Sequence, residues 1–210
     1  MQNKFAIGIP TLNRFDLLYP SILMYLKDFP NTQIFIVDNG QQQIDKKVFD
    51  DRLTIIKNDW NIGVATSWNL LCITIFEVSS HALILNDDIY LGKKENDILN
   101  LLKKKADFYI SKMAWSVFIM PKKTFVEVGS FDENFYPAYY EDADYNYRMH
   151  LMRKNIVSTP LLNPFLYKQS QTIEKAPEIV SGSIANKKFY IEKWGGEPKQ
   201  EKFKKPYNEG

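Results

Sequence analysis

The sequence predicts an α/β protein in which helices cover both faces of a mostly parallel mixed sheet. Two observations lead to this prediction. In the first hundred residues, short apolar runs alternate with amphipathic helical patterns, which is typical of layered α/β architectures. Residues 82–85 are apolar at every position, as expected for a strand that is buried on both faces of a parallel sheet.

Each expected element of the first half follows from a local pattern. Residues 5–9 form an apolar run that Pro10 stops, and this run predicts the first strand. Apolar side chains on one face of residues 16–27 predict a helix. The remaining elements predicted in this half are strands over 34–37, 53–56 and 82–85 and an apolar helix over 64–76.

The second half is rich in aromatic residues between positions 108 and 147. Its patterns predict strands over 108–110, 117–119 and 156–157, a helix over 142–154 and a helix-like stretch over 184–194. No Gly/Ser-rich linker and no internal repeat divides the chain. We therefore expect a single domain over residues 1–195, followed by a basic tail or linker over 196–210.

Composition excludes several classes of protein. The chain is 45% hydrophobic and 25% charged, which argues against disorder, and its net charge of +2 is too small for a nucleic-acid-binding surface. The single cysteine, Cys72, cannot form an internal disulfide. No apolar run approaches the length of about eighteen residues that predicts a membrane span, and no signal-peptide pattern opens the chain. A cytoplasmic protein is expected.

Four polar turns follow the predicted strands, at residues 10–14, 38–40, 58–63 and 86–88. Ligands of open α/β sheets bind outside the carboxyl ends of the strands, so these turns are candidate binding loops. A diphosphate needs a hard cation such as Mg²⁺ or Mn²⁺, which takes oxygen ligands, and adjacent Asp87 and Asp88 can divide the binding of a sugar hydroxyl and of this metal between them. The alternative is that the acidic pair only ends the strand and caps the next segment.

A second acidic group lies at the start of the predicted helix over 142–154. Glu141, Asp142 and Asp144 occur there within a segment rich in tyrosine. A carboxylate at this place could take a proton from a sugar hydroxyl, and it could equally cap the helix.

Together these motifs resemble the family 2 glycosyltransferases of the GT-A fold, in order, from Ile7 to about Arg148. Residues 9–14 resemble the first nucleotide-contacting loop, 36–40 the second, 61–65 the diphosphate loop, 85–88 the metal motif and 129–148 the acceptor-side signature. The chain also resembles virus-encoded capsid-glycosylating members, which would place it in the host cytoplasm. The resemblance implies a nucleotide-binding half over residues 1–90 and an acceptor half over 91–195.

The resemblance implies a role for each site residue. Asp38 would contact the base, Asp87 the ribose and Asp88 a Mn²⁺ or Mg²⁺ ion, with Asp142 as general base beside Glu141. The other residues expected to bind the donor are Pro10, Thr11, Asn13, Arg14, Asn61, Gly63, Asn69 and Asn86. The implied reaction is inverting transfer of a sugar from a nucleotide-diphosphate sugar, UDP-linked by preference, to a hydroxyl of a glycan or glycoprotein acceptor.

Three positions depart from the family pattern. Asn86 stands where many relatives carry Asp, and Trp68 stands where they often carry Arg, a change for which Arg14 could compensate. The late His of the metal shell is absent, and Lys168 could contact phosphate in its place. We therefore expect an ion that is held weakly without the nucleotide.

Three alternatives remain open at this point. A sugar-nucleotide pyrophosphorylase would need a Gly-rich loop after the first strand, and residues 10–14 contain no glycine. A hydrolase with paired carboxylates would leave Asp38 and the Asn61 loop without a function. A nucleotide-sugar-binding module with little catalysis would explain the missing ligands.

Overall fold

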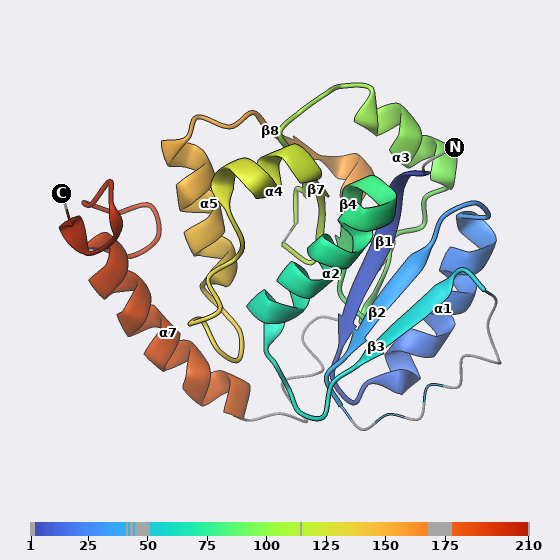
Figure 1. Cartoon of the computed structure of the whole chain (residues 1–210), viewed down its shortest axis with the longest axis horizontal. Coiled ribbons are helices and arrows are strands. Elements are labelled where there is room, and N and C mark those ends of the chain that lie inside the picture. The colour runs from blue at the N-terminus through green and yellow to red at the C-terminus, as the bar shows by residue number, and fades with distance from the viewer. Residues whose placement is uncertain are drawn as a thin grey trace.

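The computed structural model describes residues 3–40, 42, 44, 51–113, 115–167 and 178–209. Its centre is a seven-stranded sheet in the order β3-β2-β1-β4-β7-β6-β8 (Figure 1). Strands β1 to β4 run parallel to one another, whereas β7 runs antiparallel to both β4 and β6. The predicted mostly parallel mixed sheet is therefore confirmed. Its strands are β1 (Asn3–Thr11), β2 (Ile34–Asp38), β3 (Leu53–Lys57), β4 (Ser79–Leu85), β6 (Phe108–Ser111), β7 (Val117–Pro121) and β8 (Ile156–Thr159).

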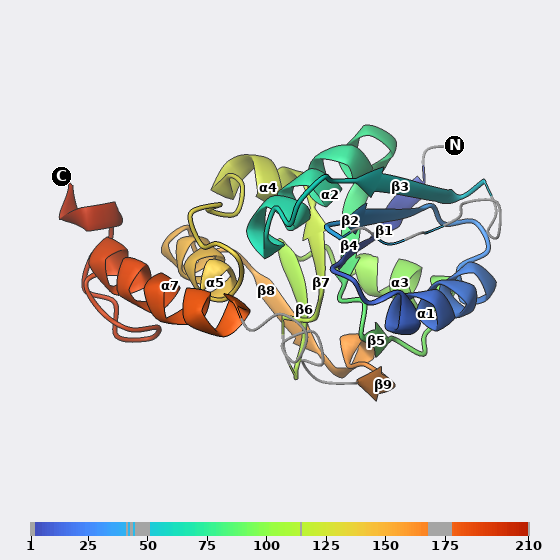
Figure 2. The same cartoon turned by 90° about the horizontal axis from the view of Figure 1, so that it is seen from below.

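Helices cover both faces of this sheet (Figure 2). On one face lie α1 (Phe15–Asp28) and α3 (Glu95–Leu102), and on the other α2 (Val64–Val78) and α4 (Lys122–Val128). Each face has its own apolar core: Leu18, Ile22 and Tyr25 of α1 belong to one, and Leu71 and Ile75 of α2 to the other. All seven sheet strands were predicted apart from their ends, because their apolar runs fill these two cores.

The helix predicted over 142–154 is shorter in the structure, where α5 spans Glu141–Leu151. The chain reverses there, because Arg153 adopts a left-handed conformation (φ 53°) and the Lys154 N–H returns to the carbonyl of Met149. The helix-like stretch predicted over 184–194 begins earlier, as α7 (Glu178–Trp194).

Several short elements were not predicted from the sequence. They are α3, α4, the two-stranded pair β5 (Ile89–Tyr90) and β9 (Leu166–Tyr167), and the 3₁₀ turns η2 (Pro160–Leu162) and η3 (Pro206–Asn208). The expectation of loops and one helix beyond Pro160 was therefore incomplete.

Helix α7 lies beside α5 at the end of the molecule that carries the C-terminus (Figures 1 and 2). Phe135, Tyr190 and Trp194 form a third buried cluster at this contact. The segment after α7, which was expected as a tail, folds back: the N–H groups of Lys202 and Phe203 donate to the Trp194 carbonyl. Among the described residues, no helix is long and apolar enough to cross a membrane.

Candidate functional site

A cavity of about 280 Å³ opens at the carboxyl ends of β1 and β4. It collects residues from segments that are far apart in the sequence, because parallel strands end at the same edge of a sheet. The acidic turn after β4 and the start of α5 both contribute to it. Its lining residues are Pro10, Thr11, Leu12, Asn39, Asn61, Gly63, Val64, Trp68, Asn86, Asp87, Asp88, Trp115, Ser116, Pro137, Ala138, Tyr139, Glu141, Asp142 and Ile179.

Nine of the thirteen predicted site residues line this cavity. They are Pro10, Thr11, Asn61, Gly63, Asn86, Asp87, Asp88, Glu141 and Asp142. Asn13, Arg14, Asp38 and Asn69 do not line it, and Lys168 lies outside the described residues.

The acidic turn is linked directly to the first loop. The Thr11 hydroxyl, at the end of β1, donates a 2.7 Å hydrogen bond to Oδ2 of Asp87. Burial raises the pKa of Asp87 to about 7; the Thr11 hydrogen bond and the Arg14 charge oppose this rise, and the Asp88 charge adds to it. A cation bound beside Asp87 and Asp88 would favour their ionised forms, so the pair offers carboxylate oxygens for a cation at the cavity wall.

Arg14 lies beside this charge although it does not line the cavity. Its guanidinium is buried and pairs with Asp16 through Nε and Nη2, each at 3.0 Å. The charges of Asp87 and Asp88 contribute to raising its pKa. Asn13 precedes it in a left-handed conformation (φ 53°) and packs against Gly40, where an added Cβ would lie 2.1 Å from the Asn13 Oδ1.

The second loop presents Asn39 rather than Asp38 to the cavity. Asp38 is fully buried and its Oδ1 accepts hydrogen bonds from the Gly40 N–H and the Gln42 amide, each at 3.0 Å. Asn39 donates to the Ser67 hydroxyl at 2.8 Å and accepts from the Asn58 amide at 2.9 Å. Asp38 therefore shapes the turn that holds Asn39 at the cavity wall.

The third loop brings the N-terminus of α2 to the cavity. Gly63 has φ 81° and ψ 170°, a backbone conformation open essentially to glycine alone, and its N–H donates to Oδ1 of Asn61 at 2.9 Å. The Val64 N–H donates to the carbonyl of Pro137 at 2.9 Å, so the loop before α5 docks on this helix start. A helix N-terminus carries partial positive charge and favours anions such as phosphate.

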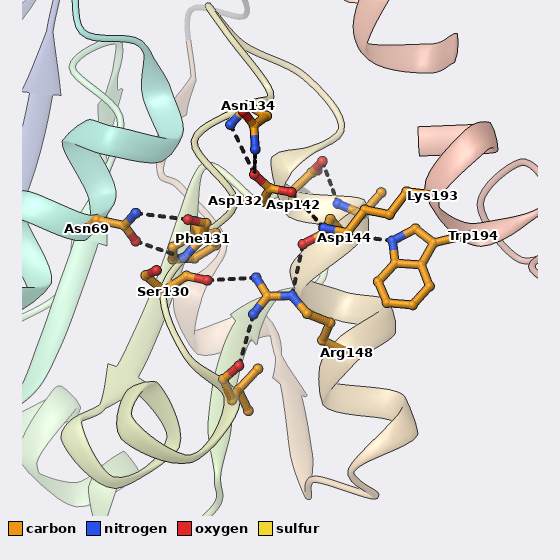
Figure 3. Close-up of polar contacts among 12 residues, drawn as sticks. Asn69, Ser130, Phe131, Asp132, Asn134, Asp142, Asp144, Arg148, Lys193 and Trp194 are labelled. Atoms are coloured by element: carbon orange, nitrogen blue, oxygen red, sulfur yellow. Dashed lines mark hydrogen bonds and ion pairs between the residues drawn. The ribbon is translucent and has the colours of Figure 1, made fainter. Parts of the chain in front are cut away.

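Asn69, a predicted donor-binding residue, contacts the segment before α5. Its amide donates to the carbonyl of Phe131 at 2.9 Å, and its Oδ1 accepts from the Phe131 N–H at 2.8 Å (Figure 3). It also donates to Glu133 at 2.8 Å. These contacts join α2 to the segment before α5, so Asn69 holds the two halves of the site together.

Glu141 and Asp142 follow two residues with left-handed backbones, Tyr139 (φ 76°) and Tyr140 (φ 75°). This conformation costs about 1–3 kcal/mol for each non-glycine residue and is typical of functional sites. Burial raises the pKa of Glu141 well above its ordinary value of 4.5, and the charge of Asp142 adds to the rise. Burial also raises the pKa of Asp142, against a 2.8 Å hydrogen bond from the Ala143 N–H. Carboxyl groups with raised pKa values in a cavity are candidates for proton transfer, and Glu141 and Asp142 meet this description.

Sequence reasoning missed several lining residues, among them Trp115, Ser116 and Ile179. Trp115 and Ser116 precede β7, whose Val117 pairs with Leu85 at the end of β4. Because β7 is antiparallel, its first residues lie at the same edge as the last residues of β4. Trp115 and Ser116 could have been predicted as lining residues only if the antiparallel orientation of β7 had been known.

The oxygen-bearing side chains of the acidic turn suit a hard divalent cation. Asp87, Asp88 and Asn86 offer oxygen atoms at one point of the cavity wall, and Mg²⁺ or Mn²⁺ is commonly bound by one or two carboxylates with water and substrate phosphates completing its shell. Among the described residues, no group of three or more His, Cys, Asp or Glu side chains could hold a metal alone. The residues present therefore fit an ion that is shared with a phosphate-bearing ligand.

Comparison with known proteins identifies the fold. No protein-family model matches the chain, and no curated protein sequence matches it. Among solved structures, GalNAc-T7 with UDP, GalNAc and Mn²⁺ matches 91% of this chain at a TM-score of 0.73 and 11% identity. A mannosyltransferase from Pyrobaculum calidifontis with GDP-Man and Mn²⁺ matches 76% of this chain at a TM-score of 0.59 and 12% identity. TarS from S. aureus matches 74% of this chain at a TM-score of 0.61 and 15% identity.

These neighbours have the GT-A glycosyltransferase fold, and this chain shares it. The chain corresponds to only part of each of them, namely 49% of the GalNAc-T7 chain, 55% of the mannosyltransferase and 35% of TarS. At this level of identity the likeness establishes the fold alone.

Proposed function

We propose that this protein is a metal-assisted glycosyltransferase that moves a sugar from a nucleotide-diphosphate sugar to a hydroxyl acceptor. The observation that supports this best is the composition of the cavity: it joins Asp87 and Asp88 from the end of β4 to Glu141 and Asp142 from the start of α5. One acidic pair suits a cation and a diphosphate, and the other suits proton transfer.

The donor would lie with its diphosphate between the acidic turn and the N-terminus of α2. Asp88 would hold a Mn²⁺ or Mg²⁺ ion, which when bound neutralises charge on the leaving diphosphate, and Asp87 would contact the ribose. The N–H groups at the start of α2 would add positive potential on the other side. UDP is the preferred nucleotide; of the solved neighbours, GalNAc-T7 holds UDP with Mn²⁺ and the mannosyltransferase holds GDP-Man with Mn²⁺.

The transfer step would use Asp142 as general base, since its carboxylate lines the cavity and its pKa is raised. Asp142 takes the proton of the acceptor hydroxyl as its oxygen attacks the anomeric carbon. The bond from that carbon to the diphosphate oxygen breaks, and the nucleoside diphosphate leaves with the electron pair. Attack from the opposite face inverts the anomeric configuration, as in the family 2 enzymes that the sequence resembles.

A glycan or glycoprotein hydroxyl is the proposed acceptor. The resemblance to capsid-glycosylating enzymes makes a capsid protein one specific acceptor to test. Neither acceptor follows from the fold.

The test is to incubate the protein with UDP-, dTDP- and GDP-sugars and Mn²⁺, with simple saccharides as acceptors. Transfer predicts release of nucleoside diphosphate and a new glycoside of inverted configuration, read by NMR. Release of free sugar alone would indicate a hydrolase. Formation of nucleoside triphosphate from added pyrophosphate would indicate a pyrophosphorylase. Tight donor binding with no product would indicate a binding module.

A further inference from the structure

The loop that leads into Glu141 and Asp142 is packed between the cavity and helix α7. Its residues Pro137, Ala138 and Tyr139 line the cavity. On the α7 side, Gly182 allows the helix to approach closely: an added Cβ there would lie 2.4 Å from Cδ of Pro137. The conformation of this cavity wall is therefore set partly by a helix that lies behind it.

Asn186 of α7 makes the most specific of these contacts. It is 3% exposed, and its amide nitrogen donates to two successive carbonyls, of Ala138 at 2.8 Å and of Tyr139 at 3.1 Å. Both amide hydrogens of one side chain are thus used on one turn of the loop. Asn186 itself is not among the residues that line the cavity.

The turn that Asn186 holds has an unfavourable backbone conformation. Tyr139 and Tyr140 are both left-handed, and non-glycine residues keep that conformation only when surrounding contacts impose it. The carbonyl of Tyr140 then accepts the N–H of Asp144 at 2.9 Å, which starts α5. Glu141 and Asp142 are the first two residues of that helix, so the turn sets the direction in which they leave the loop.

A second set of contacts from α7 holds the same helix one turn later. Lys193 and Trp194 both reach the buried carboxylate of Asp144, at 2.6 and 2.9 Å (Figure 3). Because Lys193 and Trp194 hold α5 at Asp144, a substitution of Asn186 should act on the turn before α5 and leave the helix in place.

We propose that Asn186 is a positioning residue for the general base: by holding the Tyr139–Tyr140 turn, it directs the Asp142 carboxylate into the cavity. This inference rests on the proposed function, in which Asp142 accepts the acceptor's proton. A misplacement of about 1 Å in such a group can lower the rate about 10²-fold.

The test compares Asn186→Asp and Asn186→Ala with the full-length wild type. Asn186→Asp keeps the shape of the side chain but replaces the donating amide by an acceptor that faces two carbonyl oxygens. Asn96→Ala, which removes an exposed asparagine of α3, is the matched control. Amide hydrogen exchange is measured over residues 138–145, and nucleoside diphosphate release and donor affinity are measured with UDP-hexoses and Mn²⁺.

Both Asn186 variants should show faster exchange over residues 138–145, a turnover about 10²-fold lower and an unchanged donor dissociation constant. A purely structural role would instead lower turnover and donor affinity together. The control should match the wild type in all three measurements.

Unchanged exchange in both variants would overturn the positioning role, and so would unchanged turnover beside an active wild type. A wild type that neither binds nor turns over any UDP-, dTDP- or GDP-sugar would overturn the proposed function and, with it, the positioning of a base. The two failures are therefore distinguished by the behaviour of the wild type.

Discussion

The Lys193 ammonium lies 2.6 Å from Oδ1 of Asp144 and 2.7 Å from Oδ2 of Asp132. The Lys193 side chain is 8% exposed and that of Asp144 is fully buried. One cation of α7 thus pairs with a carboxylate of α5 and with another of the loop before it (Figure 3). Arg148 pairs with the other oxygen of Asp144 at 2.9 Å, so the start of α5 is held from both sides.

Replacing Lys193 by Met should destabilise the fold by about 3 kcal/mol, because it leaves two largely buried carboxylates with less compensation. The free energy of unfolding, measured by chemical denaturation, checks this. Lys188→Met, which changes an exposed lysine of the same helix, should stay within about 0.5 kcal/mol of wild type. Equal losses of unfolding free energy in the two variants would show that the buried ion pairs of Lys193 do not stabilise the fold.

Replacing Asp142 by Asn should lower turnover by about 10²–10⁴-fold while leaving donor affinity unchanged, because only proton removal is lost. Turnover is followed as nucleoside diphosphate release and donor affinity by calorimetry. Asp51→Asn, at an exposed position just before β3, is the control. If the Asp142 variant retains full turnover, another group is the base.

Replacing Glu141 by Gln should stabilise the protein increasingly as pH rises above 4.5. Burial raises the pKa of Glu141 in the folded state, so the folded protein resists its ionisation while the unfolded chain does not. That cost is absent below the ordinary pKa of 4.5 and grows until the pH passes the folded-state pKa. Melting temperatures of both proteins from pH 4 to pH 8 test this expectation, and a constant difference would refute it.

Replacing Gly63 by Ala should destabilise more than replacing Gly129 by Ala. Both glycines have nearly the same backbone conformation, with φ 81° and ψ 170° at Gly63 and φ 89° and ψ −179° at Gly129. Each substitution should cost about 1–3 kcal/mol for this conformation. At Gly63 the new Cβ would also lie 2.9 Å from Cδ2 of Tyr136 and 3.0 Å from the Pro137 carbonyl. At Gly129 the new Cβ would lie 3.8 Å from Nη1 of Arg148, an ordinary van der Waals contact.

Denaturation curves of the two alanine variants give the difference directly. We also expect Gly63→Ala, but not Gly129→Ala, to weaken donor binding, because Gly63 itself lines the cavity at the start of α2 and Gly129 does not line it. Equal stabilities and equal donor affinities of the two variants would contradict a specific role of Gly63 in the fold and in donor binding.

The sheet strands and the large helices could be predicted because they follow apolar periodicity, as in β4 and α2. The carboxyl ends of parallel strands could then be placed at one edge, which located Thr11, Asp87 and Asp88 together. Contacts between distant segments could not be predicted this way. The antiparallel course of β7, which brings Ser116 into the cavity, depends on pairing that local sequence does not encode.

The acceptor side shows the same limit. Glu141 and Asp142 were recognisable as a motif. The contacts from α7 to the turn before them and to Asp144 after them could not be predicted, because no local pattern relates α7 to α5. Asn69 is a further example: its motif suggested the donor, whereas its amide is bonded to the backbone of Phe131. A role of Asn69 in donor binding stays a prediction, which the donor affinity of an Asn69 variant would test.

The most direct test of the central claim is calorimetric titration of the wild type and of Asp88→Asn with UDP-, dTDP- and GDP-sugars, with and without Mn²⁺. If the cavity is a nucleotide-sugar site, at least one donor binds to the wild type, and Mn²⁺ strengthens that binding about tenfold or more. Asp88→Asn should lose the effect of Mn²⁺ while it keeps the fold. Failure of every nucleotide-sugar to bind to the wild type would contradict the account.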